Sequence, residues 1–542
     1  MLTRIFTLGV CTAGLALAPF ASAAEPIASR GAQMFQANCA ACHQPTGLGI
    51  PAIFPPLASS DYLMTDKDRS IRVVLQGYSG RLVVNGTEYQ GVMPPMGTLD
   101  DDIIADVLTY VRSSWGNQGD AVLTADVQRV RAQLNSAEAN AKDPYQPLPK
   151  VPDGFKLREV VRLPLNSIRL ATMPGANWIM ALTQGGDVLR IEPATGNVVR
   201  VLTAKTYYPE AIGKNECLGL TIDSERRLYL ISNNQVRAEP YHLNRVVIFR
   251  SAPLDATGTP TDFKPWFQVD YPYGNSYFNH GVSKIEQGPD GLMYVSSGAR
   301  TDGGEVDGGV AGKASYYWKG GETDITAAIW RLDPKQDKPT LEVFARGIRN
   351  AFTFAWNDRK ELFTATNGPD ADMPEELDFV EKGKHYGFPY QFADKPVSEK
   401  PYPYTPEPPP GLKFVSAIRN FGPAGIGKSG QPMASFDPHS SPTSLVFLGP
   451  EWPAAYRGKF LMGRFGNMIQ GKDSGYDMLL LSLTKNSEGI YEAHSETFIA
   501  PLARPADALQ VGKKLYILEY TRSVSGAASG GLSPGRVLEL SW

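Results

Sequence analysis

The chain has 542 residues, of which 42% are hydrophobic and 20% are charged, and its formal net charge is −3. This length predicts more than one domain, and the composition is typical of globular proteins. A net charge so close to zero provides no basic field, so nucleic acids and anionic lipid surfaces are excluded as expected partners. The 53 glycines and 43 prolines favour many short strands and turns over long helices.

The first residues, MLTRIFTLGVCTAGLALAPFASAAEP, have the pattern of an export signal. Arg4 gives a positive start, residues 5–20 are mostly apolar, and Ala21, Ser22 and Ala23 form a small-residue cleavage site. We therefore expect residues 1–24 to be a signal peptide and the mature protein to be periplasmic. No later segment is long and apolar enough to predict a membrane span.

The segment NCAACHQPTG contains Cys39 and Cys42, the only closely spaced cysteines of the four in the chain. The pattern C-x-x-C-H attaches a c-type haem through two thioether bonds, and His43 would ligate the iron. The sixth ligand of an electron-transfer haem is usually Met or His. The downstream segment YQGVMPPMGTLDDD offers Met93 as the first choice for this ligand, with Met96 as the alternative.

Residues 27–118 are predicted to form a small all-α cytochrome c domain. In LDDDIIADVLTYVRSSWGN, apolar residues recur on one helical face, acids stand at the start and Gly116 stands at the end. Residues 119–152 begin with the weakly amphipathic ADVQRVRAQL and end with KDPYQPLPKVPDG. The prolines of this last stretch predict an extended, fairly stiff linker.

Residues 153–542 contain short apolar runs that are entered by Gly or a charged turn, such as GGDVLRIEP, RRLYLISN, DGLMYVSSG and KKLYILEY. Many short strands with this punctuation predict an all-β fold. Loose repetition over such a length favours a β-propeller over a sandwich, and the length suits six blades.

Four segments of this region are candidates for chemistry. His280 lies in a loop before a strand, and loops at one end of a propeller converge on its axis. Arg349 and Asn350 stand in the apolar segment FARGIRNAFTFAW, where a guanidinium needs a partner. The segment TNGPDADMPEELDF is rich in carboxylates, which suits calcium, and Arg504 stands just ahead of a strand. Each residue also has an ordinary structural interpretation, and both remain open.

The two regions resemble known families. Residues 28–118 resemble single-haem class I cytochrome c domains, over AQMFQANCAACHQPTGLG and MPPMGTLDDDIIADVLTYVRSSWGN. Most of residues 153–542 resembles the soluble sugar dehydrogenases that use pyrroloquinoline quinone (PQQ), the glucose/aldose sugar and sorbosone dehydrogenases. This second resemblance is strongest at NHGVSKIEQGPDGLMYVSSG, GIRNAFTFAW, NGPDADMPEELDFVEKGKHYGFP and RPADALQVGKKLYIL.

The resemblance implies a six-bladed propeller and a set of site residues. His280 would be the general base, and the quinone would be held by Arg349, Asn350, Arg464 and Arg504. The backbone carbonyls of Gly368 and Pro369 would hold Ca²⁺ against the cofactor. A neighbouring calcium site would include Glu375, Glu376 and Tyr386. The chain departs from the family at Ala506, where the glucose-oxidising members have a second arginine, and at Lys214, Asn215 and Glu216, which leaves the substrate contacts open.

These features predict an exported quinohaemoprotein that oxidises an aldose sugar, or a related alcohol or aldehyde. Hydride would move to PQQ, and electrons would then pass to the covalent haem c and to a downstream cytochrome or other acceptor. The alternative is a cytochrome c electron carrier whose propeller is a docking module without catalysis. A metal-dependent lactonase and an eight-bladed quinoprotein alcohol dehydrogenase are further rivals. The fused N-terminal cytochrome argues against the first, and the cytochrome's position and the lone Cys217 argue against the second.

Overall fold

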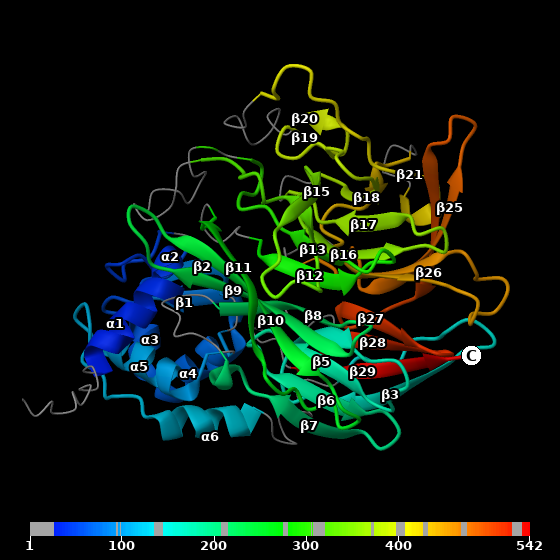
Figure 1. Cartoon of the computed structure of the whole chain (residues 1–542). Helices are drawn as coiled ribbons and strands as arrows, with labels where there is room; N and C mark the ends of the chain where they lie inside the picture. Colours follow the sequence, from blue (N-terminus) through cyan, green and yellow to red (C-terminus); the bar gives the residue numbers. More distant parts are fainter. Residues whose placement is uncertain are drawn as a thin grey trace, which may run out of the picture.

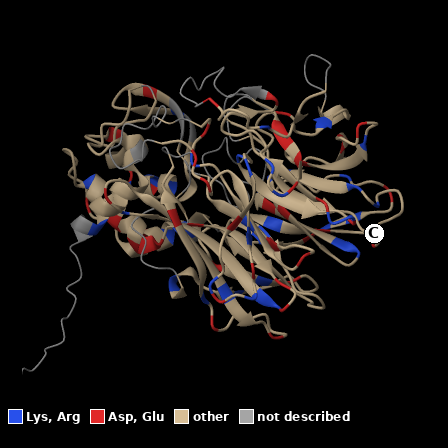
Figure 2. Ribbon diagram, turned by 45° about the horizontal axis from the view of Figure 1, so that its top comes forward, with Lys and Arg blue, Asp and Glu red and all other residues tan. Residues whose placement is uncertain are grey.

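A computed structural model of the chain describes residues 27–51, 53–93, 96–97, 99–134, 145–207, 215–274, 280–304, 306, 320–369, 373–396, 407–425, 432–467, 474–522 and 534–542. The predicted signal peptide, residues 1–24, lies outside the described residues, as do Lys214, Asp370 and Asp372. Figure 1 shows a small helical domain beside a large β-propeller. In Figure 2 basic and acidic residues are interspersed over both domains, in keeping with the net charge near zero.

The helices of the first domain are α1 (Ile27–Asn38), α2 (Ala40–His43), α3 (Asp61–Thr65), α4 (Lys67–Gln76), α5 (Asp101–Arg112) and α6 (Thr124–Leu134). The side chains of Ser60 and Asp66 cap α3 and α4 by accepting hydrogen bonds from the backbone N–H of Leu63 and Arg69. Helix α5 buries the apolar face expected from its sequence, including Ile104. No described helix is long and apolar enough to cross a membrane.

The predicted helical cytochrome domain is confirmed, and the structure adds a hairpin to it. Strands β1 (Tyr78–Val84) and β2 (Thr87–Met93) pair antiparallel around Asn85 and Gly86. These two turn residues have φ values of 51° and 75°. An Asn-Gly pair adopts two positive φ angles at little cost, which is the requirement of a tight two-residue hairpin turn. The hairpin places Met93 at its open end.

Helix α6 lies in the range that the sequence assigned to the linker, yet it packs on the helical domain. Val127 and Val130 are fully buried in a core shared with α4 and α5. Lys67 Nζ lies 2.8 Å from Asp126 Oδ2, and Arg131 pairs with Asp101 at 2.9 Å. Further along, Tyr145 already contacts the propeller, because its hydroxyl donates to the Pro534 carbonyl at 3.3 Å.

The described strands beyond residue 153 form six blades, which confirms the predicted six-bladed propeller. Blade 1 is β4 (Ser167–Ala171), β5 (Ile179–Thr183), β6 (Val188–Glu192) and β7 (Asn197–Leu202); blade 2 is β8 (Asn215–Ile222), β9 (Arg227–Val236), β10 (Leu243–Pro253) and β11 (Lys264–Pro272); blade 3 is β12 (Val282–Gln287), β13 (Met293–Ser297), β14 (Ala328–Leu332) and β15 (Glu342–Arg346).

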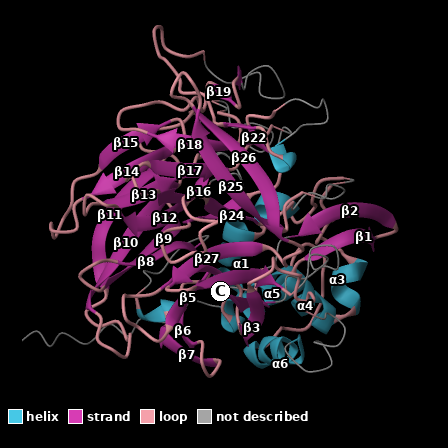
Figure 3. Cartoon of the chain, turned by 90° about the vertical axis from the view of Figure 1, so that its right-hand side faces the viewer, coloured by secondary structure: helices cyan, strands magenta, loops and turns pink. Residues whose placement is uncertain are grey.

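Blade 4 is β16 (Ala351–Trp356), β17 (Leu362–Thr366), β18 (Glu375–Val380) and β22 (Ser435–Phe436); blade 5 is β23 (Pro442–Phe447), β24 (Phe460–Arg464), β25 (Asp477–Lys485) and β26 (Tyr491–Ile499), with β21 (Arg419–Asn420) on its edge; blade 6 is β27 (Pro505–Val511), β28 (Lys514–Thr521), β29 (Pro534–Ser541) and β3 (Lys156–Arg162). The short element η1 (Ala204–Thr206) lies between blades 1 and 2. The pair β19 (Gln391–Phe392) and β20 (Lys395–Pro396), and η4 (Pro423–Gly425), lie in the insertion between β18 and β22 of blade 4. In Figure 3 the sheets follow one another around a common centre.

Blade 6 closes the ring by joining the two ends of the propeller sequence. Strand β3 from the start of this region pairs antiparallel with β29 from the chain's end. Buried Arg536 reinforces the joint, because its Nε donates to Glu519 at 2.6 Å and its Nη1 to Glu159 at 3.0 Å. Pairing both terminal strands leaves no open edge at the seam, so the blades form a continuous circle.

The axis of the propeller is occupied by the side chain of Arg169. This residue lies on the innermost strand β4 and is 1% exposed. Its guanidinium donates to backbone carbonyls of four other inner strands: Leu218 (2.9 Å), Ser283 (3.3 Å), Phe352 (2.6 Å) and Thr443 (3.4 Å). Burial lowers the pKa of Arg169 to about 10, which leaves the group charged at neutral pH. One cation thus ties strands β4, β8, β12, β16 and β23 together.

We expect Arg169→Met to destabilise the propeller by about 2–4 kcal/mol, because it leaves several buried carbonyls without a donor. Urea unfolding followed by tryptophan fluorescence measures the change. Arg200→Met is the matched control, since Arg200 is half exposed and pairs with Asp187 at the surface. Equal urea midpoints for the two variants would contradict the role assigned to Arg169.

Candidate functional site

The helical domain contains a deep apolar cavity with an empty volume of about 1080 Å³, counting the space at its mouth. Its wall includes all three residues of the C-x-x-C-H motif that would bond a haem, with Met93 and aromatic and aliphatic side chains. The lining residues used below are Cys39, Cys42, His43, Pro55 and Met93.

His43 is held in the orientation that an iron ligand needs. The residue is buried, and its Nδ1 lies 3.0 Å from the Pro55 carbonyl oxygen. A carbonyl can only accept, so Nδ1 carries the proton and Nε2 keeps the lone pair for a metal. Burial lowers the pKa of His43, which favours the neutral imidazole that binds iron.

The two cysteines are neutral thiols in this apolar wall. Burial raises the pKa of Cys39 to about 12, with the neighbouring Cys42 adding to the effect, and burial also raises the pKa of Cys42. The backbone N–H of His43 donates to the Cys39 carbonyl at 3.0 Å, so one helical turn carries the whole motif. The motif therefore fits a haem that is bonded by two thioethers and ligated by His43.

The two candidate methionines differ in position. Met93, at the end of β2, lines the cavity, whereas Met96 is not among the lining residues. The backbone N–H of Met96 instead donates to the Val74 carbonyl at 2.8 Å.

The second candidate site is the mouth at one end of the propeller. His280, Asn350 and Arg504 stand directly before the inner strands β12, β16 and β27. Gly368 follows β17, and Arg464 ends β24, the strands that run back along β16 and β23. Because adjacent strands are antiparallel, the starts of inner strands and the ends of their neighbours meet at the same end. The fold therefore gathers these sequence-predicted residues at one end of the propeller.

Backbone hydrogen bonds bring His280 and Asn350 together. The N–H of His280 donates to the Ala299 carbonyl at 2.9 Å, and the N–H of Ala299 donates to the Arg349 carbonyl at 2.7 Å. The side chains then meet, with His280 Nδ1 3.3 Å from Asn350 Nδ2.

Arg349 forms a buried ion pair that the sequence interpretation missed. Its Nη2 lies 2.5 Å from Asp302 Oδ1, and both side chains are almost completely buried. Its Nη1 donates to the carbonyls of Asn367 (2.9 Å) and Gly368 (2.8 Å). Asp302 lies far from Arg349 in the sequence, and no local motif marks it as the partner. Arg349 therefore orders the Gly368 loop, whatever else it contacts.

Arg464 and Arg504 are neighbouring buried cations. Arg464 makes a bidentate pair with Asp477 at 2.8 and 2.6 Å, and its Nη1 lies 3.6 Å from Asp437 without a hydrogen bond. Arg504 donates to the carbonyls of Gly466 (3.3 Å) and Asn467 (3.0 Å), but its buried Nε has no hydrogen-bond partner among the described residues.

Unmatched buried N–H groups are costly in a native structure. Their presence here fits a ligand that carries carboxylates, as PQQ does. Arg504 also has a φ of 58°. A non-glycine residue with this backbone conformation is strained, and such strain often marks a functional site.

Glu375 holds the Gly368 loop from the other side. Its two carboxylate oxygens accept from the backbone N–H of Gly368 at 2.5 Å and of Ser441 at 3.1 Å. Burial raises the pKa of Glu375. The Tyr386 hydroxyl is also engaged, because it donates to the Phe379 carbonyl and accepts from the Glu381 N–H. Its backbone carbonyl is therefore the atom of Tyr386 that could bind a cation.

Near this loop, the carboxylates of Glu376, Asp378 and Asp394 lie together in one cluster. Glu376 and Asp378 are buried, whereas the Asp394 side chain is 25% exposed and lies 3.8 Å from Arg419. One oxygen of Glu376, both oxygens of Asp378 and one of Asp394 are buried without a hydrogen-bond partner among the described residues. Burial raises the pKa of Asp378 to about 8, and Asp394 adds to this shift. Burial and Asp378 likewise raise the pKa of Glu376 well above its usual value. Sequence interpretation found Glu376 but not Asp378 or Asp394.

The described His, Cys, Asp and Glu side chains include no group of three with the arrangement of a formed metal site. The carboxylate cluster still has the chemistry of a cation site, because a calcium site also uses backbone oxygens and water, which a count of side chains leaves out. The raised pKa values of Glu376 and Asp378 point the same way, since buried carboxylates need either a counter-charge or protons.

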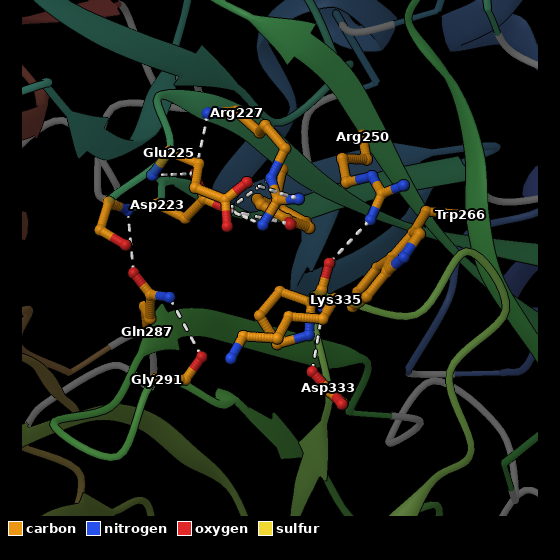
Figure 4. A network of polar contacts seen from close by, with 12 residues as sticks. Asp223, Glu225, Arg227, Arg250, Trp266, Gln287, Gly291, Asp333 and Lys335 are labelled. Atoms are coloured by element: carbon orange, nitrogen blue, oxygen red, sulfur yellow. Dashed lines mark hydrogen bonds and ion pairs between the residues drawn. The ribbon is translucent and has the colours of Figure 1, made fainter.

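A further charged network lies away from the mouth and has a structural role. Figure 4 shows it at the turn between β8 and β9, the opposite end of the inner strands. Asp223 accepts from Arg227 Nε at 2.7 Å and from the Tyr229 hydroxyl at 3.1 Å. Gln287 accepts from the Ser224 N–H at 2.8 Å, which joins blades 2 and 3. Charge clustering alone therefore does not identify the site.

Two family models match the chain. The model described as Cytochrome c matches residues 28–115, and the model described as Glucose / Sorbosone dehydrogenase matches residues 221–468. Cytochrome c-552 of Thermus thermophilus is 39% identical over 112 residues, which cover 19% of this chain and 85% of that protein. The cytochrome c subunit of a quinone alcohol dehydrogenase from Gluconobacter oxydans is 34% identical over 104 residues, which cover 19% of this chain and 22% of that subunit.

Among solved structures, the PQQ-bound aldose sugar dehydrogenase of Streptomyces coelicolor is similar over 72% of this chain and 99% of that chain. Its sequence identity is 17%, and the TM-score is 0.45.

Proposed function

Because the chain belongs to the cytochrome c family over its N-terminal domain and carries a glucose/sorbosone dehydrogenase domain in its propeller, we propose that it is an exported quinohaemoprotein. In this proposal it oxidises an aldose sugar, or a related alcohol or aldehyde, with PQQ as hydride acceptor. Electrons then pass to the haem and to an external acceptor. The observation that carries the proposal is the gathering of His280 and three buried arginines at one propeller mouth.

We propose that the cationic groups of the mouth hold PQQ. The cofactor carries three carboxylates, and guanidinium groups bind carboxylates with charge-assisted hydrogen bonds. Among the described residues of the mouth, the buried Nε of Arg504 and Nη1 of Arg464 have no hydrogen-bond partner, although Arg464 Nη1 lies 3.6 Å from Asp437. Arg349 already pairs with Asp302, so we assign it the ordering of the Gly368 loop as well as a contact with the quinone.

His280 is the proposed general base, which takes the proton of the substrate hydroxyl. It lies on the loop before an inner strand, and its backbone and ring are both hydrogen-bonded to neighbouring loops. An imidazole has an unperturbed pKa near ~6.5, which suits proton transfer near neutral pH.

For the haem, we propose covalent bonds from Cys39 and Cys42 and axial ligation by His43 and Met93. The position of Met93 on the cavity wall supports it over Met96. A thioether ligand favours ferrous iron and raises the potential, as an electron acceptor needs.

We propose two calcium positions. The carbonyls of Gly368 and Pro369 would hold the ion that lies against the cofactor. Gly368 accepts one bond from Arg349, and a carbonyl has a second lone pair. The second position is the carboxylate cluster of Glu376, Asp378 and Asp394, with Tyr386 contributing its carbonyl, while Glu375 supports the Gly368 loop.

The arrangement of the domains supports an internal electron path. Strand β29 ends away from the mouth, and Figure 1 shows the helices on the opposite side from the C-terminus. Lys205, in η1 between β7 and β8, pairs with Asp100 at the start of α5 at 3.0 Å. Both side chains are exposed, so this pair is worth at most about 1 kcal/mol. The helical domain thus contacts the mouth side of the propeller through a weak electrostatic bond.

We expect a sugar or alcohol substrate to reduce the haem only when PQQ and Ca²⁺ are bound. His280→Ala should slow this reduction by about 10²–10⁴-fold, the usual contribution of a general base. Stopped-flow spectra of the ferrous haem bands measure the rate, and a rate constant independent of protein concentration marks transfer within one chain. His494→Ala is the control, since His494 is exposed on blade 5.

Two results would contradict this proposal. Equal rates of haem reduction in His280→Ala and His494→Ala would show that His280 is not the general base. Absence of stoichiometric PQQ binding by the purified protein would favour the alternative, a cytochrome with a non-catalytic docking propeller.

Met93→Ala should remove the thioether ligand and lower the haem reduction potential, whereas Met96→Ala should leave the potential unchanged. Redox titration followed by the visible spectrum checks both variants. The reverse pattern would assign the ligand to Met96.

Calcium should stabilise the chelator-treated protein and raise its melting temperature. At a free Ca²⁺ concentration of 100 times the Kd, the free energy of unfolding should increase by about 2.7 kcal/mol. Asp378→Asn should reduce this effect and also stabilise the calcium-free protein, because folding must otherwise either protonate Asp378, whose pKa burial raises to about 8, or bury its charge. Calorimetry with and without Ca²⁺ measures both changes, with the exposed Asp262→Asn as control. The proposed calcium site would be contradicted if Asp378→Asn lowered the stability of the calcium-free protein and left the stabilisation by calcium unchanged.

A further inference from the structure

We propose that Asn350 is a positioning residue that selects the tautomer of His280. Its side-chain oxygen accepts the proton of His280 Nδ1, so that Nε2 presents a lone pair to the substrate hydroxyl. This inference rests on the proposed function, in which His280 is the base. It gives Asn350 a role toward the histidine, beyond the quinone contact that the family resemblance implies.

The backbone around His280 is fixed from two sides. On one side, the carbonyl of Ala299 accepts the His280 N–H at 2.9 Å. A Cβ atom on Gly298 would lie 2.6 Å from the Cβ of His280, so the two segments are in close contact. On the other side, Asn233 holds Val282, accepting its N–H at 2.8 Å and donating to its carbonyl at 2.9 Å. The histidine therefore retains freedom mainly in its side-chain torsions.

Asn350 is anchored just as firmly on the neighbouring segment. Its carbonyl accepts the N–H of Asn367 at 3.0 Å and the Asn367 side-chain amide at 3.3 Å. The Arg349 carbonyl, one residue earlier, accepts the N–H of Ala299 at 2.7 Å. The structure places the amide with Asn350 Nδ2 3.3 Å from His280 Nδ1, and the hydrogen-bonded backbone segments on both sides set this contact.

The proposed role of His280 as a base requires the oxygen of the Asn350 amide, rather than its nitrogen, to face the ring. The oxygen and nitrogen of an asparagine amide exchange places by a half-turn, and the two arrangements require opposite histidine tautomers. If the amide nitrogen donated to Nδ1, the ring proton would stand on Nε2, and Nε2 could not accept a proton. A base that acts through Nε2 needs the amide oxygen on a protonated Nδ1.

An amide differs from a carboxylate in what it does to the ring. Both orient the imidazole, but a carboxylate also stabilises the imidazolium that forms when the base accepts a proton. Asn350→Asp is nearly isosteric and can only accept at neutral pH, so it retains the proposed tautomer. Asn350→Leu has a similar shape and makes no hydrogen bond, so it releases the ring. The two variants separate tautomer selection from simple packing.

The test is ¹⁵N NMR of histidine-labelled protein without PQQ or substrate, at a pH where imidazoles are neutral. The chain has six histidines, and the His280 signals are those that disappear in His280→Gln. We expect a protonated Nδ1 and a bare Nε2 in the wild type and in Asn350→Asp, and a mixture of tautomers in Asn350→Leu. Steady-state kcat should fall about 10- to 100-fold in Asn350→Leu, the range for losing a supporting hydrogen bond.

Two outcomes would overturn the inference: a proton on Nε2 in the wild type, or an unchanged tautomer in Asn350→Leu. The first outcome is read from the wild type alone, so it can overturn the inference even if the leucine variant fails to fold. The result is separate from the fate of the proposed function. An inactive His280→Ala with unchanged tautomers in Asn350→Leu would retain His280 as base and reject Asn350 as its positioning residue.

Discussion

The architecture depends on a buried guanidinium at the axis of the propeller. The inner strands of the blades turn their backbones toward the axis, and carbonyls there need donors that water does not supply. Arg169 satisfies carbonyls from four of these strands, while Asp507 on β27 accepts the neighbouring Leu170 N–H at 2.8 Å. A single side chain thus sets the spacing of the inner strands. The carbonyls in turn stabilise a charge that burial alone would make very costly.

This ring determines where chemistry can occur. Each inner strand starts at the same end, so the residues just before β12, β16 and β27 face one another although they are far apart in the sequence. His280, Asn350 and Arg504 hold these positions, and backbone hydrogen bonds through Ala299 set the separation of His280 and Asn350. The helical domain contacts the same end through Lys205 and Asp100. Oxidation chemistry and an electron acceptor can therefore share one side of the molecule.

Local signals in the sequence predicted much of this. The C-x-x-C-H motif needs only one helical turn, and it identified the residues that line the cavity. Short apolar runs separated by turn residues, together with the length of this region, predicted six blades, and the observed sheets confirm them. The predicted sugar dehydrogenase class is confirmed by the family model that matches residues 221–468. The β1–β2 hairpin was missed although Asn85-Gly86 marks its turn. Helix α6 was assigned to a linker because its weak amphipathic pattern does not reveal that Val127 and Val130 have a partner surface.

Contacts between residues of separate segments could not be predicted from the sequence. These contacts determine the electrostatics of the mouth. No local pattern joins Asp302 to Arg349, or Asp378 to Asp394, because each pair forms only when separate segments meet. The described protein leaves unmatched N–H groups on Arg464 and Arg504, and unmatched oxygens on Glu376, Asp378 and Asp394. Ion pairs within the protein compensate each set only in part, since Asp437 lies 3.6 Å from Arg464 Nη1 and Arg419 lies 3.8 Å from Asp394. In the proposed function, a polycarboxylate cofactor would pair with the first set and a divalent cation with the second.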